Sequence, residues 1–197
     1  MTDVLDDVRA HLRTHFAQEG ITDEPDAASV TFLGTESIDI LRFGPGGADV
    51  VHYVSLGCSR YPMTDPTDVA ADPVRGPRAE VMVALRGSSP AGLARSVAVL
   101  AAAPVVEGLV LTPDALVDLG TPLWGGAPFT AFLLGRSEID DVALPAPYDR
   151  VAVLSAVPIT PTEAAWVRLK GADAMREAWR TDGVDVLDPK RPASAPS

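Results

Sequence analysis

The seven residues Val151–Val157, Val-Ala-Val-Leu-Ser-Ala-Val, form a nearly unbroken apolar run. A run of this length that is rich in β-branched residues is typical of a central strand buried on both faces. Thr160 and Pro161 follow almost at once, and Glu163 completes a capping box that predicts the start of a helix. The chain must therefore fold around a buried strand that leads directly into a helix.

Strand and helix signals alternate along the rest of the chain. Apolar residues at helical spacing predict an N-terminal helix at about 3–17, and Gly44–Gly47 predicts a hairpin turn. Ser89-Pro90 predicts the start of a helix that ends at Pro104, and Gly183 would close a last helix. Further strands are predicted at 29–33, 37–43, 49–56, 78–86, 109–112 and 129–134. This order predicts an α+β (α/β sandwich-like) fold, with a mixed, mainly antiparallel sheet and helices packed on it.

The length and composition fit one domain. With 197 residues, of which 47% are hydrophobic, the chain is long enough for one good core. We expect a single domain at 1–188 and a disordered tail at 189–197, where Pro, Ala and Ser dominate. No apolar run reaches the roughly 18 residues that span a bilayer, and the N-terminus is acidic. With a single cysteine, Cys58, these features predict a cytoplasmic protein without a membrane association or a disulfide.

The net charge of −11, from 16 basic and 27 acidic residues, narrows the class of partner. Nucleic-acid binding needs clustered Lys and Arg to neutralise phosphates, so no nucleic-acid partner is expected. An acidic surface would suit a basic protein partner, although it could also serve solubility alone.

No complete catalytic set is present, and no cofactor or metal is predicted. Gly57-Cys58-Ser59-Arg60-Tyr61 begins like a nucleophile elbow, but Tyr61 stands where the second glycine belongs. Cys58 with His52 could form a thiol–imidazole pair, but a small buried cysteine is the commoner case. His11 and His15 share a helix face without the Glu of a zinc-binding helix motif or an evident third ligand.

Two irregular segments are the candidates for partner binding. Ser59, Arg60 and Tyr61 begin the Pro-rich stretch Gly57–Pro77, and long loops in compact domains are often functional. Trp124 lies in the turn-rich segment 120–126 and would either anchor a partner or fill a groove beside the sheet.

Several segments together carry a resemblance to a known family. In chain order they are His52–Ser59, Arg78–Leu85, Gly120–Leu123, Ala152–Thr160 with Glu163, Gly183–Asp185 and Asp188–Arg191. In this order the chain resembles the suppressor of fused domain in its bacterial form, over roughly residues 28–191. The resemblance implies an α/β sandwich-like domain without known catalysis. Animal members bind a transcription factor with an additional C-terminal region, so that activity is not transferred here, while many bacterial members are regarded as immunity proteins that neutralise toxins.

Three functions follow as hypotheses. The leading one is a non-enzymatic protein-binding module, an immunity protein with a basic toxin domain as its partner. The second is a small-molecule-binding protein or enzyme with a pocket near Ser59, Arg60 and Trp124. The third is a structural homodimer, a homo-oligomer formed by an exposed sheet edge.

Overall fold

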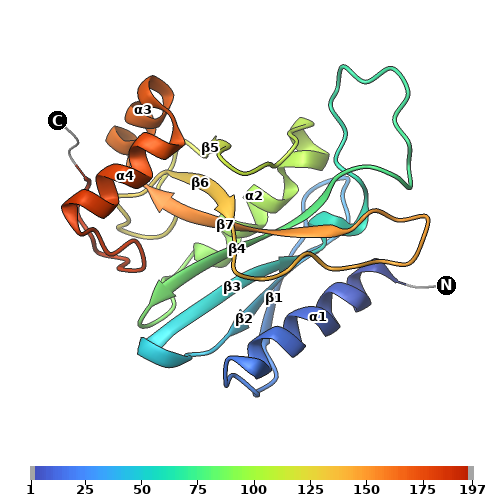
Figure 1. Ribbon diagram of the computed structural model, residues 1–197, viewed down its shortest axis with the longest axis horizontal. Coiled ribbons are helices and arrows are strands. Elements are labelled where there is room, and N and C mark those ends of the chain that lie inside the picture. Colours follow the sequence, from blue (N-terminus) through green and yellow to red (C-terminus); the bar gives the residue numbers. More distant parts are fainter. Residues whose placement is uncertain (1–2, 195–197) are drawn as a thin grey trace.

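The computed structural model describes residues 3–194 and contains one seven-stranded sheet (Figure 1). The strand order is β1-β2-β3-β4-β7-β6-β5, and every pair is antiparallel except the parallel pair β4–β7. The mixed, mainly antiparallel α+β fold is thus confirmed. The elements are α1 (Val4–Gln18), β1 (Asp26–Val30), β2 (Ile38–Phe43), β3 (Val50–Leu56), β4 (Arg78–Arg86), α2 (Leu93–Glu107), β5 (Leu116–Asp118), β6 (Ala131–Arg136), β7 (Val151–Ile159), α3 (Pro161–Lys170) and α4 (Ala172–Asp182), with short 3₁₀ turns at Gly47–Asp49 and Cys58–Arg60.

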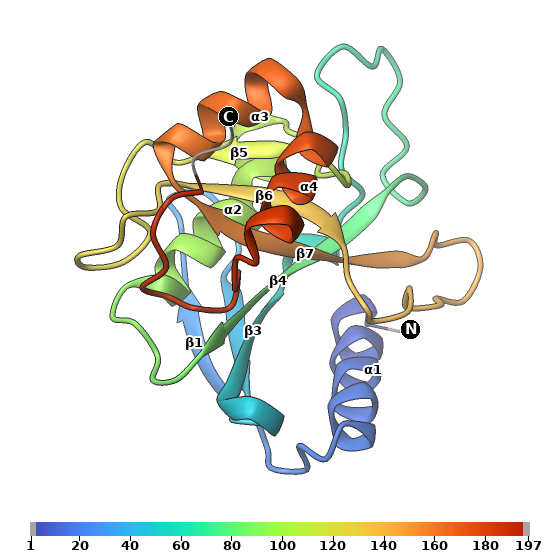
Figure 2. The same cartoon turned by 60° about the vertical axis from the view of Figure 1, so that its left-hand side comes forward.

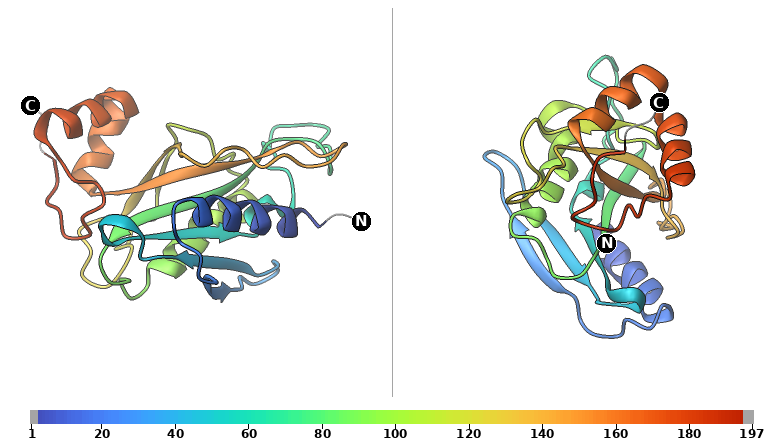
Figure 3. Two further views of the ribbon diagram at one scale, coloured as in Figure 1. Left: turned by 60° about the horizontal axis from the view of Figure 1, so that its bottom comes forward. Right: turned by 90° about the vertical axis from the view of Figure 1, so that its left-hand side faces the viewer.

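Helices cover the two faces of the sheet unequally. Alternate strand residues such as Val81, Val83 and Leu85 pack with α2 on one face. On the other face α1 packs near the start of β7, over Val151 and Val153, whereas α3 and α4 pack over its end. Figures 2 and 3 show α1 and the α3–α4 pair as separate covers at different ends of the sheet. Among residues 3–194, no helix covers the middle of this face.

The strand predicted at Val151–Val157 and the helix start predicted at Thr160–Glu163 are confirmed. β7 runs through Val151–Ile159 between β4 and β6, with most of its side chains buried. The Thr160 side chain accepts a hydrogen bond from the Glu163 backbone N–H, and the Glu163 carboxylate accepts one from the Thr160 N–H. This reciprocal cap begins α3 directly after the strand.

The N-terminal elements also follow their local signals. Asp3 caps α1, whose buried face, Val4, Val8, Leu12 and Phe16, packs on β2 and β3. The predicted turn at Gly44–Gly47 connects β2 to β3. Gly44 has φ +105°, and a Cβ there would lie 2.9 Å from the Val50 carbonyl oxygen, so a side chain would not fit this turn.

Several local predictions differ from the structure, and β1 and β6 are displaced by two or three residues from the predicted 29–33 and 129–134. Residues 109–112 form no strand; Leu111 is buried with its N–H directed at the Met63 sulfur, and β5 follows at Leu116–Asp118. α2 begins at Leu93 rather than at Ser89-Pro90, because Gly92 is left-handed at φ +100°. Pro104 lies inside α2, where it removes only one hydrogen bond near the end of the helix.

The expected tail differs as well. Residues 184–194, here called the C-terminal strap, run back across the sheet, and the Leu187 carbonyl accepts a hydrogen bond from the Arg86 N–H at 2.8 Å. Arg191 and Ser194 are buried, so 189–194 are packed against the domain. A buried charge interaction, described below, fixes this segment in place of the disorder suggested by its composition. Residues 195–197 of the predicted tail lie outside the described residues.

Candidate functional site

A buried carboxylate fixes the backbone turn after β3. Glu80 is fully buried, and its Oε1 accepts hydrogen bonds from the N–H groups of Gly57 and Ser59, both at 2.9 Å, and from the Ser59 hydroxyl at 2.6 Å. Its Oε2 accepts a bond from the Ser55 hydroxyl at 2.5 Å. Burial raises the pKa of the Glu80 carboxyl, against the opposing effect of these donors. Ser59 is therefore a positioning residue inside the protein and is not exposed to a partner.

Arg78 supports the other side of the same turn. Its guanidinium is buried beneath the carbonyls of Ser59 and Arg60, to which it donates bonds of 2.7 and 2.9 Å, and it reaches the Val74 carbonyl at 3.0 Å. Arg78 and Glu80 alternate with the core residues of β4. Together they hold the turn and both ends of the long loop in one conformation.

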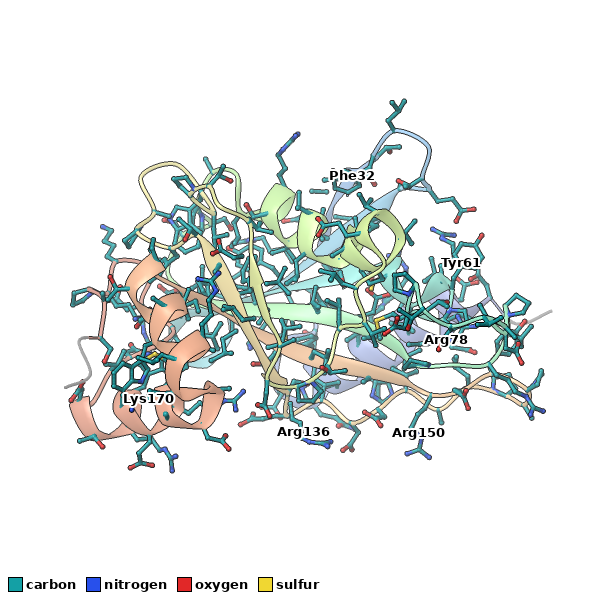
Figure 4. The ribbon with its side chains drawn as sticks, turned by 90° about the horizontal axis from the view of Figure 1, so that it is seen from above. Phe32, Tyr61, Arg78, Arg136, Arg150 and Lys170 are labelled. Atoms are coloured by element: carbon teal, nitrogen blue, oxygen red, sulfur yellow. The ribbon has the colours of Figure 1, made fainter. Side chains whose placement is uncertain are left out.

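The fixed turn presents Arg60 and Tyr61 at the surface. Tyr61 is 55% exposed, and Arg60 forms an ion pair with Glu36. Val105, on the last turns of α2 and 60% exposed, lines the same shallow hollow as these residues. Figure 4 shows Tyr61 and Arg78 on the same side of the molecule, far from Lys170 of α3. We call Glu36, Arg60, Tyr61 and Val105 the Tyr61 surface.

Trp124 lies in the position expected of a residue that fills a groove beside the sheet, the second of the two roles considered from the sequence. It is only 8% exposed and packs on Phe129 with ring centroids 5.4 Å apart. It borders a hollow of about 550 Å³ that extends along α2 as far as Glu107, whereas Arg60 lines a different hollow with Ala101, Ala102 and Val105 of that helix. The structure therefore does not bring Ser59, Arg60 and Trp124 into one pocket: Ser59 is buried, and the other two line different hollows.

Cys58 and His52 do not form a reactive pair in this arrangement. Cys58 is buried, and burial together with the charge of Glu80 raises the pKa of its thiol well above the ordinary value. His52 instead faces the opposite side of the sheet, beside Phe16 with ring centroids 5.0 Å apart.

This burial predicts slow thiol chemistry. We expect iodoacetamide to alkylate Cys58 in the native chain at least about tenfold more slowly than in the chain unfolded in guanidinium chloride, because the thiolate is the reactive form. Mass spectrometry at timed intervals measures both rates. Equal rates would show that Cys58 is accessible and ionised in the folded protein.

A groove crosses the uncovered middle of the sheet between α1 and the C-terminal strap. Its volume is about 520 Å³, and its floor includes His52, Met82, Ala84, Ser155 and Val157. Two apolar side chains of the strap, Val186 and Leu187, also line it, together with Phe16 of α1. Sequence reasoning did not identify this groove, because its residues come from six separate segments.

A second buried carboxylate holds the strap. Glu163 is fully buried and accepts bonds from Arg191 at 2.7 and 3.1 Å, from the Trp179 indole at 3.0 Å and from the Ser194 N–H at 3.1 Å. The Arg191 guanidinium also lies over the Phe129 ring, 4.9 Å from its centroid. Burial acts to raise the pKa of Glu163, but the bonds from Arg191 and Thr160 outweigh it and lower the pKa. The sequence showed Glu163 only as a helix cap.

Within 3–194, no group of three or more His, Cys, Asp and Glu side chains is arranged to hold a metal ion, and His11 and His15 gain no third ligand. None of the helices formed by these residues has the length and apolar character to cross a membrane.

The sequence and the fold correspond to a known family. The family model for Suppressor of fused protein (SUFU) matches residues 34–192, and the chain belongs to this family. Membership of this regulatory family suggests that the chain is a protein-interaction module. A comparison with curated proteins returns no match.

Solved structures share the fold. A putative SUFU homolog from Neisseria gonorrhoeae FA 1090 is 18% identical, with a TM-score of 0.66, and the match covers 99% of this chain and 98% of that one. A chain from the Sufu-Fu complex is 16% identical, with a TM-score of 0.66 and coverage of 96% and 91%. Drosophila Suppressor of Fused is 16% identical with a TM-score of 0.68; the match covers 98% of this chain and 51% of that one.

Proposed function

We propose that this chain is a non-enzymatic protein-binding module that acts as an immunity protein and neutralises a basic toxin domain. The Tyr61 surface is the observation that carries the proposal. It combines an exposed aromatic ring, the neighbouring Val105 and an Arg60–Glu36 ion pair on a backbone held by Glu80 and Arg78. Exposed aromatic and Arg side chains on a rigid support are the groups that most often dominate protein interfaces.

Two further observations support a basic protein as the partner. The net charge of −11 would attract a cationic domain and speed its association. A structural relative, 16% identical, was solved in a Sufu-Fu complex. That relative's partner is not transferred to this chain; it is an instance of the fold in a complex with another protein.

Partner capture tests the function. The chain, immobilised as a whole, is exposed to lysate of its native cells, and captured proteins are identified by mass spectrometry and then purified. The proposal expects a basic partner that binds at micromolar concentration or tighter and whose toxicity in a co-expression growth assay is suppressed by this chain. A partner without toxicity would overturn the immunity role, and no partner at micromolar protein would overturn the binding function.

A substitution locates the interface. Tyr61→Ala is expected to weaken binding of that purified partner by about tenfold or more, since truncating a central aromatic anchor typically costs more than 1 kcal/mol. Leu169→Ala is the matched control, because Leu169 is 73% exposed on α3, away from the Tyr61 surface. Isothermal titration calorimetry measures both. Equal affinities for the two variants would remove Tyr61 from the interface.

The other two hypotheses rank lower. A small-molecule pocket near Ser59, Arg60 and Trp124 lacks its basis, because those residues do not line one cavity. The homodimer stays a prediction, and β1 is the long exposed sheet edge on which it would depend. Light scattering at high concentration tests it, and a monomer would exclude it.

A further inference from the structure

The groove between α1 and the C-terminal strap combines an apolar floor with acidic rims. Met82, Ala84 and Val157 are partly buried on the floor, and Val186 of the strap faces the groove from the side. The strip stays open because α1 packs over one end of β7 and α3–α4 over the other. In the views of Figures 2 and 3, the strap and α1 lie on either side of this strip.

Two carboxylates without partners line the groove. Glu19 follows α1 and Glu138 lies between β6 and β7; within residues 3–194 neither forms an ion pair or accepts a side-chain hydrogen bond. Both are close enough to His52 to act on its pKa. Burial first, and then His15, lower the pKa of His52 below 6.5 despite these carboxylates, so its imidazole is neutral at pH 7.

The remaining charge does not cancel this acidic character. Arg136 lines one end of the groove, is exposed and also lines an adjoining hollow that contains Asp114. Figure 4 shows Arg136 at the margin of the molecule. At pH 7 the groove therefore offers two carboxylates, one peripheral guanidinium and neutral His52, with His15 beside them.

We propose that this groove binds a lysine or arginine side chain carried on an apolar, extended segment of a protein partner. The aliphatic stem lies on Met82, Val157 and Val186, and the cationic end lies between Glu19 and Glu138. A long basic side chain suits this combination, because its stem is apolar and only its tip is charged.

This site lies on the sheet face opposite α2, apart from the Tyr61 surface. The groove can therefore fail to bind a basic segment while the proposed function stands. Equally, the proposed function can fail while the groove binds such a segment. It also predicts a pH dependence. As the pH falls through the pKa of His52, the new positive charge faces His15, Arg136 and the bound cation, and only Glu19 and Glu138 oppose it, so affinity for the basic segment falls.

The test uses the whole chain and a blocked pentapeptide, Val-Lys-Leu-Arg-Val, with Val-Glu-Leu-Glu-Val as its acidic counterpart. A titration followed by ¹⁵N–¹H NMR is expected to shift the amide signals of Met82, Ala84, Val157 and Val186 with the basic peptide only. Equal or tighter binding of the acidic peptide, or shifts confined to other regions, would overturn the proposal.

Charge-matched variants complete the test. The double variant Glu19→Gln, Glu138→Gln is expected to bind the basic peptide about tenfold or more weakly than the parent chain at low ionic strength. Asp68→Asn with Glu107→Gln removes the same two charges from exposed positions elsewhere and is expected to change affinity less than about twofold. Equal effects of the two pairs would show general charge attraction and reject the site. If Tyr61→Ala binds the basic peptide as tightly as the parent chain does, the groove and the Tyr61 surface are separate binding sites.

Discussion

Replacing Arg191 with alanine is expected to lower the free energy of unfolding by about 3–5 kcal/mol. Arg191 is 3% exposed and donates two bonds to the fully buried Glu163, so its loss would leave a carboxylate charged and unpaired in the core. Urea unfolding followed by circular dichroism measures the change. Arg180→Ala is the control, because its pair with Glu177 is exposed, and we expect a loss below about 1 kcal/mol.

The same pair predicts an acid limit to stability. The pKa of Glu163 is lowered from 4.5 in the folded state, so its contribution is present above about pH 4.5 and is lost as the pH falls through the folded-state value. In Arg191→Ala the carboxyl no longer gains from the pair, and the loss of stability relative to the parent chain should shrink in acid. A difference that stays constant between pH 7 and pH 3 would contradict this assignment.

The second large effect is expected at Glu80. Glu80→Ala should cost about 3 kcal/mol or more, because the N–H groups of Gly57 and Ser59 lose their buried acceptor. Glu80→Gln should cost less, since its carbonyl oxygen can accept the same bonds while its amide donates to Ser55. Urea unfolding compares the two variants. Equal costs would mean that these hydrogen bonds do not account for the role of Glu80.

Glu80 has the opposite pH behaviour to Glu163. Its pKa is raised from 4.5 in the folded state, so its contribution is full below about pH 4.5 and declines as the pH rises through the folded-state value. The Gln side chain does not titrate. The stability of Glu80→Gln relative to the parent chain should therefore increase between pH 4.5 and pH 8, and a decrease over that range would reverse the assigned shift.

Local sequence patterns predicted the strands, turns and helix starts that depend only on neighbouring residues. The run Val151–Val157 and the Thr160–Glu163 cap are complete within a dozen positions, so strand, turn and helix were all predictable. The packing of the tail was not predictable, because the bond from Arg191 to Glu163 crosses 28 positions. Composition cannot show that a charged residue near the chain end has a buried partner.

The candidate site was predicted only in part. The Gly57–Arg60 turn was identified as a candidate, but Ser59 is buried by Glu80, 21 positions away, and Trp124 fills the hydrophobic core. Arg60 and Tyr61 reach the surface, although their role in binding stays a prediction. The groove depends on which face of the sheet each helix covers, and no short sequence motif encodes that choice.

The parallel pair β4–β7 has a consequence for folding during synthesis. It joins an antiparallel half, β1–β4, to a second half, β7–β6–β5, and Arg78 pairs with Val151, which is made 73 positions later. Until β7 leaves the ribosome, one edge of the apolar strand β4 lacks its partner, and such an edge can pair with other chains. Ribosome-bound chains that end before Val151 should therefore be the most aggregation-prone and the most dependent on chaperones.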